Sequence, residues 1–274
     1  MSQSFWCYCM LLLAGVVVVL VAIFSDNPNH TTDLKNLTNV ARTVTGTLIP
    51  LKAHFVYGLW DTSPLPLKYK KCIQGWRDQG WEIKVWNKFE VEEVLREYPV
   101  WWTLYQNFDR RVQAADLARY VIVYDQGGFY FDCDCSPGSL SLKDHLLTTG
   151  YDWTSVFFIE NFMPNSWIRT TAHRFPIREG INEKHERLAN FSFGAVAQHP
   201  VLLTVLHTVE NRCRRNPGKM DDYGVLYTTG PDAVTDALAE IRSNYSSTEL
   251  QIISHSDYMT HHATGTWRNA QDRP

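Results

Sequence analysis

The sequence predicts an α/β fold with a mostly parallel sheet that is covered by helices. Short apolar or aromatic runs, such as residues 81–86 and 129–131, alternate with segments of helical spacing, such as residues 111–124. This alternation is typical of parallel strands joined by crossover helices. The sequence contains no internal repeat, no Gly-x-Gly-x-x-Gly loop and no phosphate-loop motif. Any nucleotide site must therefore be built from other residues.

The predicted elements begin near Thr47. Strands are predicted at 54–59, 81–86, 129–131, 153–159, 193–197 and 251–254, and helices at 69–79, 91–97, 111–124, 200–212 and 231–241. Gly80 and the pair Gly127–Gly128 end helices, Pro99 closes the helix at 91–97, and a proline lies near the start of each of the last two helices. Because open sheets bind ligands beyond the carboxyl ends of their strands, we expect a site just after residues 129–131.

Length and composition narrow the class of protein. A chain of 274 residues, 45% hydrophobic, can form one large domain or two small ones. Its net charge of −3 lacks the basic excess of nucleic-acid-binding proteins, so no nucleic-acid partner is expected. The cysteines are too few for a disulfide scaffold at this length. Cys72, Cys133, Cys135 and Cys213 leave one bridge possible, with a pairing that the sequence does not determine.

The N-terminal segment is distinct from the rest of the chain. Residues 5–24 carry no charge and are just long enough to span a bilayer as one helix. A cleaved signal peptide is the alternative, but no basic region precedes the segment and no clear small-x-small cleavage site follows it. The expected organisation is a cytoplasmic tail at 1–4, a transmembrane signal anchor at 5–24, a stem at 25–46 and a lumenal domain at 47–274.

The orientation of this anchor rests on two opposing signals. Lys35 and Arg42 follow the segment and no basic residue precedes it, which weakly disfavours a lumenal body. Glycosylation sequons at Asn29, Asn36, Asn190 and Asn244 favour a lumenal body. The working topology is a single-pass type II protein of the Golgi or ER membrane.

The most informative stretch runs from Gly127 to Cys135 and reads Gly-Gly-Phe-Tyr-Phe-Asp-Cys-Asp-Cys. Residues two apart in a strand face the same side, so Asp132 and Asp134 are expected to point the same way. Two adjacent carboxylates repel each other unless a cation lies between them, and Mg²⁺ or Mn²⁺ would leave positions open for substrate phosphates. An Asp-x-Asp pair also arises by chance, but an apolar strand rarely ends in two aligned acids without a role.

Asp116 and Arg119 lie three residues apart on the preceding helix and therefore share one of its faces. They could form a surface ion pair. However, the apolar residues around them indicate burial, and buried charges need partners. Near a metal site, such a pair could bind sugar hydroxyls.

The spacing of Asp116, Arg119, Gly127–Gly128, Asp132 and Asp134 resembles the signature of glycosyltransferase family 32. Further similar pieces are Gly58-Leu59-Trp60, residues 80–86, the stretch from Asn190 to His199-Pro200, Thr229-Gly230-Pro231, and His261-His262 to Trp267. The resemblance covers roughly residues 48–267. That family includes inositol-phosphoceramide mannosyltransferases, α-1,6-mannosyltransferases, and galactosyl- and N-acetylglucosaminyltransferases.

The resemblance implies a GT-A fold, a nucleotide-sugar donor, a glycan or glycolipid acceptor, and Mn²⁺ or Mg²⁺ as cofactor. It implies that Asp134 holds the metal, that Asp132 contacts the ribose or the metal, and that His262 approaches the metal or the diphosphate. It also implies that Asp116 and Arg119 bind the donor sugar. It further implies Trp60 near the nucleotide base, Asn190 at the transferred sugar or acceptor, and Thr266 and Trp267 on the phosphates. Cys133, Cys135 and Thr266 depart from the family pattern but remove no ligand. Asn190 is also the first residue of a glycosylation sequon. Because a glycan at this position would block the cleft, we expect Asn190 to be unmodified.

We therefore expect a membrane-anchored, metal-dependent retaining hexosyltransferase, with Asp132, Asp134, Asp116 and Arg119 as its catalytic residues. GDP-mannose is the first choice of donor, and UDP-galactose or UDP-N-acetylglucosamine is the alternative. Two other classes remain open: a non-catalytic, membrane-tethered carbohydrate-binding protein, and a metal-dependent hydrolase that uses the same aspartates.

Overall fold

The structure is a computed structural model that describes residues 8–13, 16–21, 48–60, 63–108, 110–150, 152–162, 186–218 and 220–265. It divides the chain into two compact units, residues 1–45 and residues 46–274. The second unit contains all the predicted site residues.

In the first unit, β1 (Tyr8–Leu13) and β2 (Val16–Val21) pair in antiparallel fashion, with Leu13 opposite Val16. The helix predicted across residues 5–24 is thus not confirmed, and valine-rich segments such as β2 do favour extended backbone. Among the residues that the structure describes, no helix combines the length and the apolar character needed to cross a bilayer. The rest of the predicted anchor and the stem at 25–46 lie outside the described residues.

The second unit is built on a mixed six-stranded sheet. Its strand order is β4 (Glu82–Trp86), β3 (Lys52–Val56), β5 (Gly128–Phe131), β8 (Glu186–Ala195), β7 (Ser155–Phe162) and β9 (Gln251–Ser254). β8 runs antiparallel to both of its neighbours, and the other pairings are parallel. The prediction of a mostly parallel sheet is confirmed, with β8 as the reversed strand.

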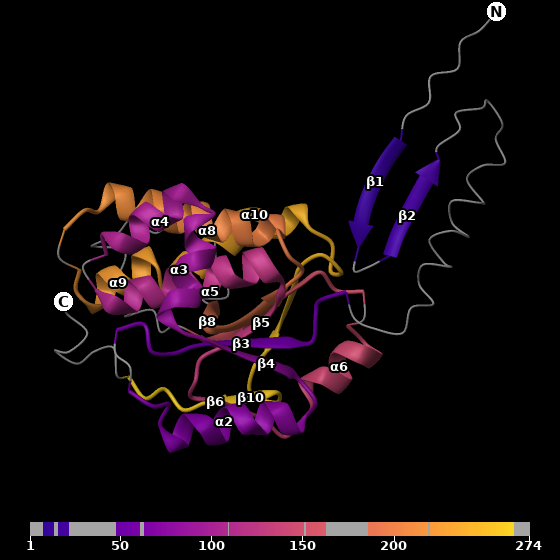
Figure 1. Cartoon of the computed structure of the whole chain (residues 1–274), viewed down its shortest axis with the longest axis horizontal. Coiled ribbons are helices and arrows are strands. Elements are labelled where there is room, and N and C mark those ends of the chain that lie inside the picture. Colours follow the sequence, from indigo (N-terminus) through magenta and orange to yellow (C-terminus); the bar gives the residue numbers. More distant parts are fainter. Residues whose placement is uncertain are drawn as a thin grey trace, which may run out of the picture. The chain divides into compact units, whose positions relative to one another are not determined.

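Helices cover both faces of this sheet, as predicted (Figure 1). One face carries α3 (Lys88–Arg96), α4 (Pro99–Gln106), α5 (Arg111–Gln126), α8 (Pro200–Arg215), α9 (Asp222–Thr228) and α10 (Pro231–Ile241), which the short helix η1 (Arg242–Asn244) follows. The other face carries α2 (Leu67–Asp78) and α6 (Leu142–Thr148), together with the small antiparallel pair β6 (Cys135–Pro137) and β10 (Met259–His261).

Two hydrophobic clusters lie on opposite faces of the sheet, and β5 contributes to both. Phe129 and Phe131 pack with Trp76 of α2, whereas Tyr130 packs with the cluster of α5, α8 and α10. This alternation is the period of a strand that is buried on both faces. α5 is buried on most of its surface, and its buried residues include the charged Asp116 and Arg119. The charges of α5 therefore lie inside the domain.

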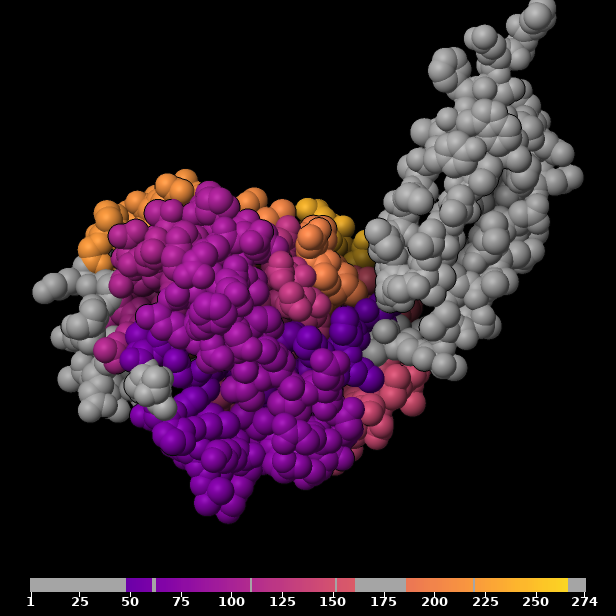
Figure 2. All heavy atoms as spheres, viewed as in Figure 1, coloured from indigo at the N-terminus to yellow at the C-terminus, as the bar shows by residue number. Residues whose placement is uncertain are grey.

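The two halves of the sequence occupy different parts of this unit. In Figure 2 the first half of the unit, from indigo to magenta, covers most of the visible face, and segments of the second half appear along its upper edge. Both halves contribute residues to the main cavity, for example Asp116 from the first and Asn190 from the second.

Some boundaries differ from the predicted ones. Pro99 does not merely close a helix but begins α4, because proline is tolerated in a first helical turn. β8 starts at Glu186, well before the predicted residue 193. The short helices α6 and α9 were not predicted, although each has an N-cap, Ser141 and Asp221 respectively, whose side chain accepts a backbone hydrogen bond.

Candidate active site

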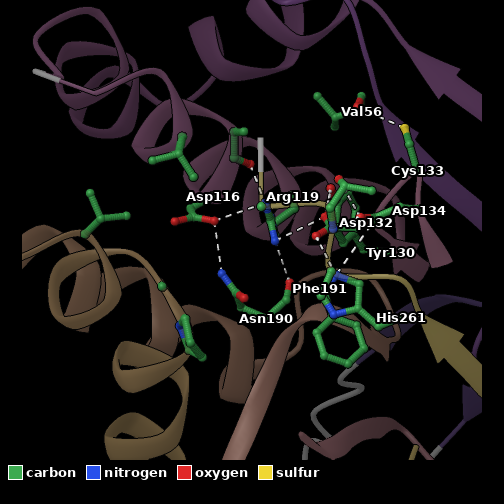
Figure 3. Close-up of a pocket in the computed structure, with 18 of the residues that line it drawn as sticks. Val56, Asp116, Arg119, Tyr130, Asp132, Cys133, Asp134, Asn190, Phe191 and His261 are labelled. Carbon is green, nitrogen blue, oxygen red and sulfur yellow. Dashed lines mark hydrogen bonds and ion pairs between the residues drawn. The ribbon is translucent and has the colours of Figure 1, made fainter. Parts of the chain in front are cut away.

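A cavity of about 510 Å³ lies at the carboxyl ends of the parallel strands. Its lining includes Asp116 and Arg119 of α5, Asp132 and Asp134 after β5, Asn190 of β8 and His261 of β10 (Figure 3). Because β8 is reversed, residues near its beginning reach the same edge of the sheet as residues that follow β5. The structure thus brings together residues that are far apart in the sequence.

The two aspartates are placed by a turn. β5 ends at Phe131, and the backbone N–H of Cys135 donates to the carbonyl of Asp132 at 2.9 Å. We predicted that strand alternation would point both acids to the same side. In the structure, this turn after β5 places them in the cavity instead. Within this turn the Cys133 thiol donates to the carbonyl of Val56 at 3.4 Å. The turn is thereby tied to the end of β3.

Each aspartate has one oxygen that is held by the protein. The Tyr130 hydroxyl donates to Asp132 Oδ1 at 2.7 Å. The backbone N–H and the hydroxyl of Thr264 both donate to Asp134 Oδ2, each at 2.9 Å. The other oxygens, Asp132 Oδ2 and Asp134 Oδ1, lie 3.9 and 3.4 Å from His261 Nε2. Three potential metal ligands therefore converge on one point.

The electrostatics of this point follow from burial and pairing. Burial opposes ionisation of Asp134, but the hydrogen bonds from His261 and Thr264 outweigh it and lower the pKa of Asp134 well below its usual range. Burial likewise disfavours the imidazolium of His261, but Asp134 and Asp132 outweigh it and raise the pKa of His261. His261 and Arg119 are thus the two basic side chains that the structure places next to this pair of carboxylates.

The histidine that faces the aspartates is His261, whereas the resemblance implied His262. The side chain of His262 is exposed, and its Nε2 lies 3.0 Å from the Ser136 hydroxyl. His261 instead stacks on Phe191, with ring centroids 4.0 Å apart, and points toward the acids (Figure 3). His261 is the last residue of β10, and His262 follows the strand with its side chain exposed, so His261 is the histidine that lines the cavity.

The residues at this point fit a divalent cation. Potential ligand atoms of Asp134, Cys135 and His261 lie within 4.8 Å of one another. Cys135 is fully buried, and burial raises the pKa of its thiol, so it is a poor ligand. Carboxylate oxygens with one imidazole suit Mn²⁺ or Mg²⁺. Asp132, Asp134 and His261 would therefore hold the ion.

Beside this point lies a buried charged network (Figure 3). Arg119 contacts Asp116 Oδ1 at 3.0 Å and Asp132 Oδ1 at 3.3 Å, and it donates to the Asn190 carbonyl at 2.9 Å. Burial disfavours the charged guanidinium, but Asp132, Tyr130 and Asp116 outweigh burial and raise the pKa of Arg119. Arg119 therefore stays charged and links the sugar-binding candidates to the aspartate turn.

Asp116 is held from two further directions. The Asn190 side-chain amide donates to its Oδ1 at 3.0 Å, and the Thr229 hydroxyl donates to its Oδ2 at 2.8 Å. Asp116 and Asn190 both line the cavity. They present an acceptor and a donor side by side, which is the combination that recognises a sugar hydroxyl.

The remaining predicted residues are only partly described. Trp60 lines the main cavity and is 43% exposed. A second cavity of about 540 Å³ shares Leu59, Trp60 and Arg111 with the first. Thr266 and Trp267 lie outside the described residues. Cys72, Cys133, Cys135 and Cys213 are free cysteines, so the possible bridge is not formed among them.

Several residues of the site were not predicted from the sequence. Tyr130 could have been found, because it alternates with Asp132. Thr229 lies in a Thr-Gly-Pro helix start that was noticed only as a motif. His261, Thr264, Glu160 and Arg187 also line the cavity, but no local sequence signal marks them as site residues. Their positions in the cavity depend on contacts between segments that are far apart in the sequence.

Part of the chain matches a family of known proteins. Residues 66–146 match the family model described as a glycosyltransferase sugar-binding region containing a DXD motif. This region includes Asp116, Arg119 and the Asp132–Asp134 turn. Residues 66–146 are thus similar to a DXD-containing sugar-binding region of glycosyltransferases. The resemblance of the chain to glycosyltransferase family 32 is confirmed.

Two curated relatives come from Schizosaccharomyces pombe. Inositol phosphoceramide mannosyltransferase 3 is 31% identical over 84 residues, which is 29% of this chain and 23% of the relative. Inositol phosphoceramide mannosyltransferase 1 is 26% identical over 157 residues, which is 54% of this chain and 46% of the relative. The matched regions span less than half the length of these relatives.

Two solved structures show a distant likeness. The PaToxG glycosyltransferase has a TM-score of 0.46 and 13% identity, and the match covers 77% of each chain. The ligand-free glycosyltransferase domain of the YGT toxin has a TM-score of 0.44 and 11% identity, with 81% of this chain and 84% of the other covered.

Proposed function

We propose that this protein transfers a hexose from a nucleoside diphosphate sugar to a hydroxyl group of an acceptor. The observation that carries the proposal is the convergence of Asp132 Oδ2, Asp134 Oδ1 and His261 Nε2 beside the buried Asp116–Arg119 pair. The first group suits a cation that neutralises a diphosphate, and the second suits a sugar.

Each residue has a stated task in this proposal. Asp132, Asp134 and His261 hold Mn²⁺ or Mg²⁺, which stabilises the departing nucleoside diphosphate when bound. Asp116 accepts hydrogen bonds from hydroxyls of the sugar. Arg119 donates hydrogen bonds to the sugar and counters the charge of Asp132. Trp60, Thr266 and Trp267 remain proposed contacts of the nucleotide and its phosphates, on the resemblance alone.

The finer features of the proposal rest on the curated relatives and on the resemblance to glycosyltransferase family 32. GDP-mannose is the preferred donor, because both curated relatives are named mannosyltransferases. UDP-galactose and UDP-N-acetylglucosamine are the alternatives. A glycan or glycolipid acceptor, a GT-A fold, retention of anomeric configuration, and a type II anchor in the Golgi or ER membrane complete the proposal.

The test is a panel of nucleotide sugars with Mn²⁺, in which released nucleotide is measured with and without acceptor. We expect Asp132→Ala and Asp134→Ala to abolish turnover and to leave the melting cooperative. Asp78→Ala is the matched control, because Asp78 is exposed on α2. Near-wild-type turnover in the purified double variant would overturn the proposal. Donor hydrolysis without transfer would favour a hydrolase, and sugar binding without either reaction would favour a non-catalytic binding protein.

A further inference from the structure

A second cluster of charges lies at the same edge of the sheet and has no place in the mechanism above. Arg187 Nε is 3.3 Å from Glu160 Oε2 and 3.3 Å from Asp232 Oδ1. Glu160 is near the end of β7, Arg187 is near the start of β8, and Asp232 is in the first turn of α10. Because β7 runs parallel to β5, Glu160 lies at the edge where Asp132 follows β5.

The exposed part of this cluster faces the main cavity. Glu160 and Arg187 both line that cavity, and their side chains are 26% and 10% exposed. The Asp232 side chain is only 6% exposed and does not line the cavity. Asp232 thus serves as the buried partner of Arg187, while Glu160 and Arg187 can reach a ligand.

Among the residues that the structure describes, the ion pairs of this cluster join one guanidinium to two carboxylates. This set carries one negative charge in excess when both carboxyls are ionised. Burial raises the pKa of Asp232 to about 6, so this carboxyl is largely ionised at neutral pH. The excess charge is most accessible at Glu160. A carboxylate in that position gains from a ligand that donates hydrogen bonds.

Glu160 and Arg187 line the same cavity as Asp132, Asp134 and Arg119. Two carboxylate–guanidinium pairs therefore line this one cavity. Asp116 and Arg119 come from α5, and Glu160 and Arg187 come from β7 and β8.

We propose that Glu160 and Arg187 bind the acceptor, through two neighbouring hydroxyls of a sugar or cyclitol ring. A carboxylate only accepts hydrogen bonds and a guanidinium only donates them. Of two vicinal hydroxyls, one can donate to the carboxylate while the other accepts from the guanidinium. A transferase needs one subsite for the sugar that moves and another for the acceptor, and this cavity has two pairs of matching chemistry. The inference rests on the proposed transferase function and specifies the acceptor side of that site.

Direct binding is the first measurement. Saturation-transfer NMR would use methyl α-D-mannopyranoside, which represents a glycan, and myo-inositol 1-phosphate, which represents a lipid headgroup. We expect at least one of them to bind the full-length protein, and Glu160→Ala to weaken that binding about tenfold or more, as loss of a charged hydrogen bond predicts. Glu160→Gln keeps a carbonyl acceptor and should lose less. Asp78→Ala is the control and should bind as the wild type does.

Kinetics separate the acceptor site from the donor site. With GDP-mannose and Mn²⁺, Glu160→Ala should raise the KM for the acceptor by about tenfold or more, as it weakens polyol binding. The KM for the donor and the rate of donor hydrolysis without acceptor should stay within about twofold of the wild-type values. Arg187 is left intact, because its removal would leave Asp232 buried without its counter-ion.

Each remaining outcome has a definite meaning. If neither polyol binds the wild type, or if Glu160→Ala binds them unchanged, the acceptor assignment is wrong. Equal loss of donor and acceptor affinity would also overturn it, because Glu160 would then belong to the donor site. If polyol binding depends on Glu160 but no nucleotide sugar is turned over, the acceptor site stands and the transferase function fails.

Discussion

The side-chain amide of Asn190 donates a 3.0 Å hydrogen bond to Asp116 Oδ1, and it thereby joins the middle of β8 to the middle of α5. Asn190 is also the first residue of an Asn-Phe-Ser sequon. A glycan on this nitrogen would have to fit into the cavity beside Asp116 and would disturb this contact. The structure therefore opposes modification of this sequon.

We predict that Asn190 is unmodified when the protein is produced in a eukaryotic secretory host. Ser192 of the same sequon is fully buried, whereas Asn244 lies exposed in η1. Glycopeptide mass spectrometry should find the peptide of Asn190 bare, with Asn244 as the internal comparison for an exposed sequon. A glycan mapped at Asn190 would remove this residue from the site.

Arg119 is predicted to be essential for stability as well as for binding. Arg119→Ala would leave Asp116 and Asp132 without their shared cation and should cost about 3–5 kcal/mol in the free energy of unfolding. Arg119→Lys should cost less, because a lysine keeps the charge but cannot contact both carboxylates in the same geometry. Chemical denaturation monitored by tryptophan fluorescence measures both. A loss below about 1 kcal/mol for the alanine variant would contradict the network.

The two adjacent histidines provide a matched test of the cation site. His261→Ala should abolish most of the rise in melting temperature that Mn²⁺ causes in the wild type, because a ligand stabilises the folded state in proportion to its affinity. His262→Ala should keep that rise, since His262 faces Ser136 and solvent. The opposite result for the two variants would reassign the metal ligand to His262, as the sequence argument held.

His54 should make stability depend on pH in a predictable direction. It is fully buried between Trp86, whose indole N–H donates to Nδ1 at 2.9 Å, and the Gly127 carbonyl, which lies 2.8 Å from Nε2. Burial lowers the pKa of His54 to about 4. The unfolded chain, with an ordinary histidine pKa near 6.5, therefore binds more protons, and the contribution of His54 is present above pH 6.5 and is lost as pH falls toward 4.

The measurement compares His54→Gln with the wild type by urea unfolding at pH 7.5 and pH 5. The stability advantage of the wild type should shrink by about 2 kcal/mol between these pH values. Asp232, whose pKa is raised to about 6 by burial, acts in the opposite direction, but it is present in both proteins and cancels in the difference. A difference that is constant with pH would show that His54 titrates normally.

The sequence predicts elements best where local chemistry marks their ends. The structure has α10 and β9 at the predicted residues, since Pro231 begins the helix and a polar stretch separates the two. α9 was missed because seven residues are too few to show helical periodicity. The early start of β8 was missed because the polar Asn190 interrupts its apolar run.

The site divides in the same way. Asp116, Arg119, Asp132 and Asp134 could be selected from spacing within one helix and the strand that follows it. The choice between His261 and His262 could not, because it depends on the register of β10 against β6, which places His261 opposite Cys135. Arg187 and Glu160 meet only through the pairing of β7 with the reversed β8. Pairing between strands that are distant in the sequence cannot be predicted from local sequence patterns.

The pairing of β10 with β6 has a consequence for the order of events during synthesis. Translation delivers Asp132 and Asp134 long before it delivers His261 and Thr264. Until β10 docks, the acidic turn lacks both the imidazole and the threonine donors that fix its geometry. The proposed metal site would therefore be complete in a nascent chain only after β10 has paired with β6.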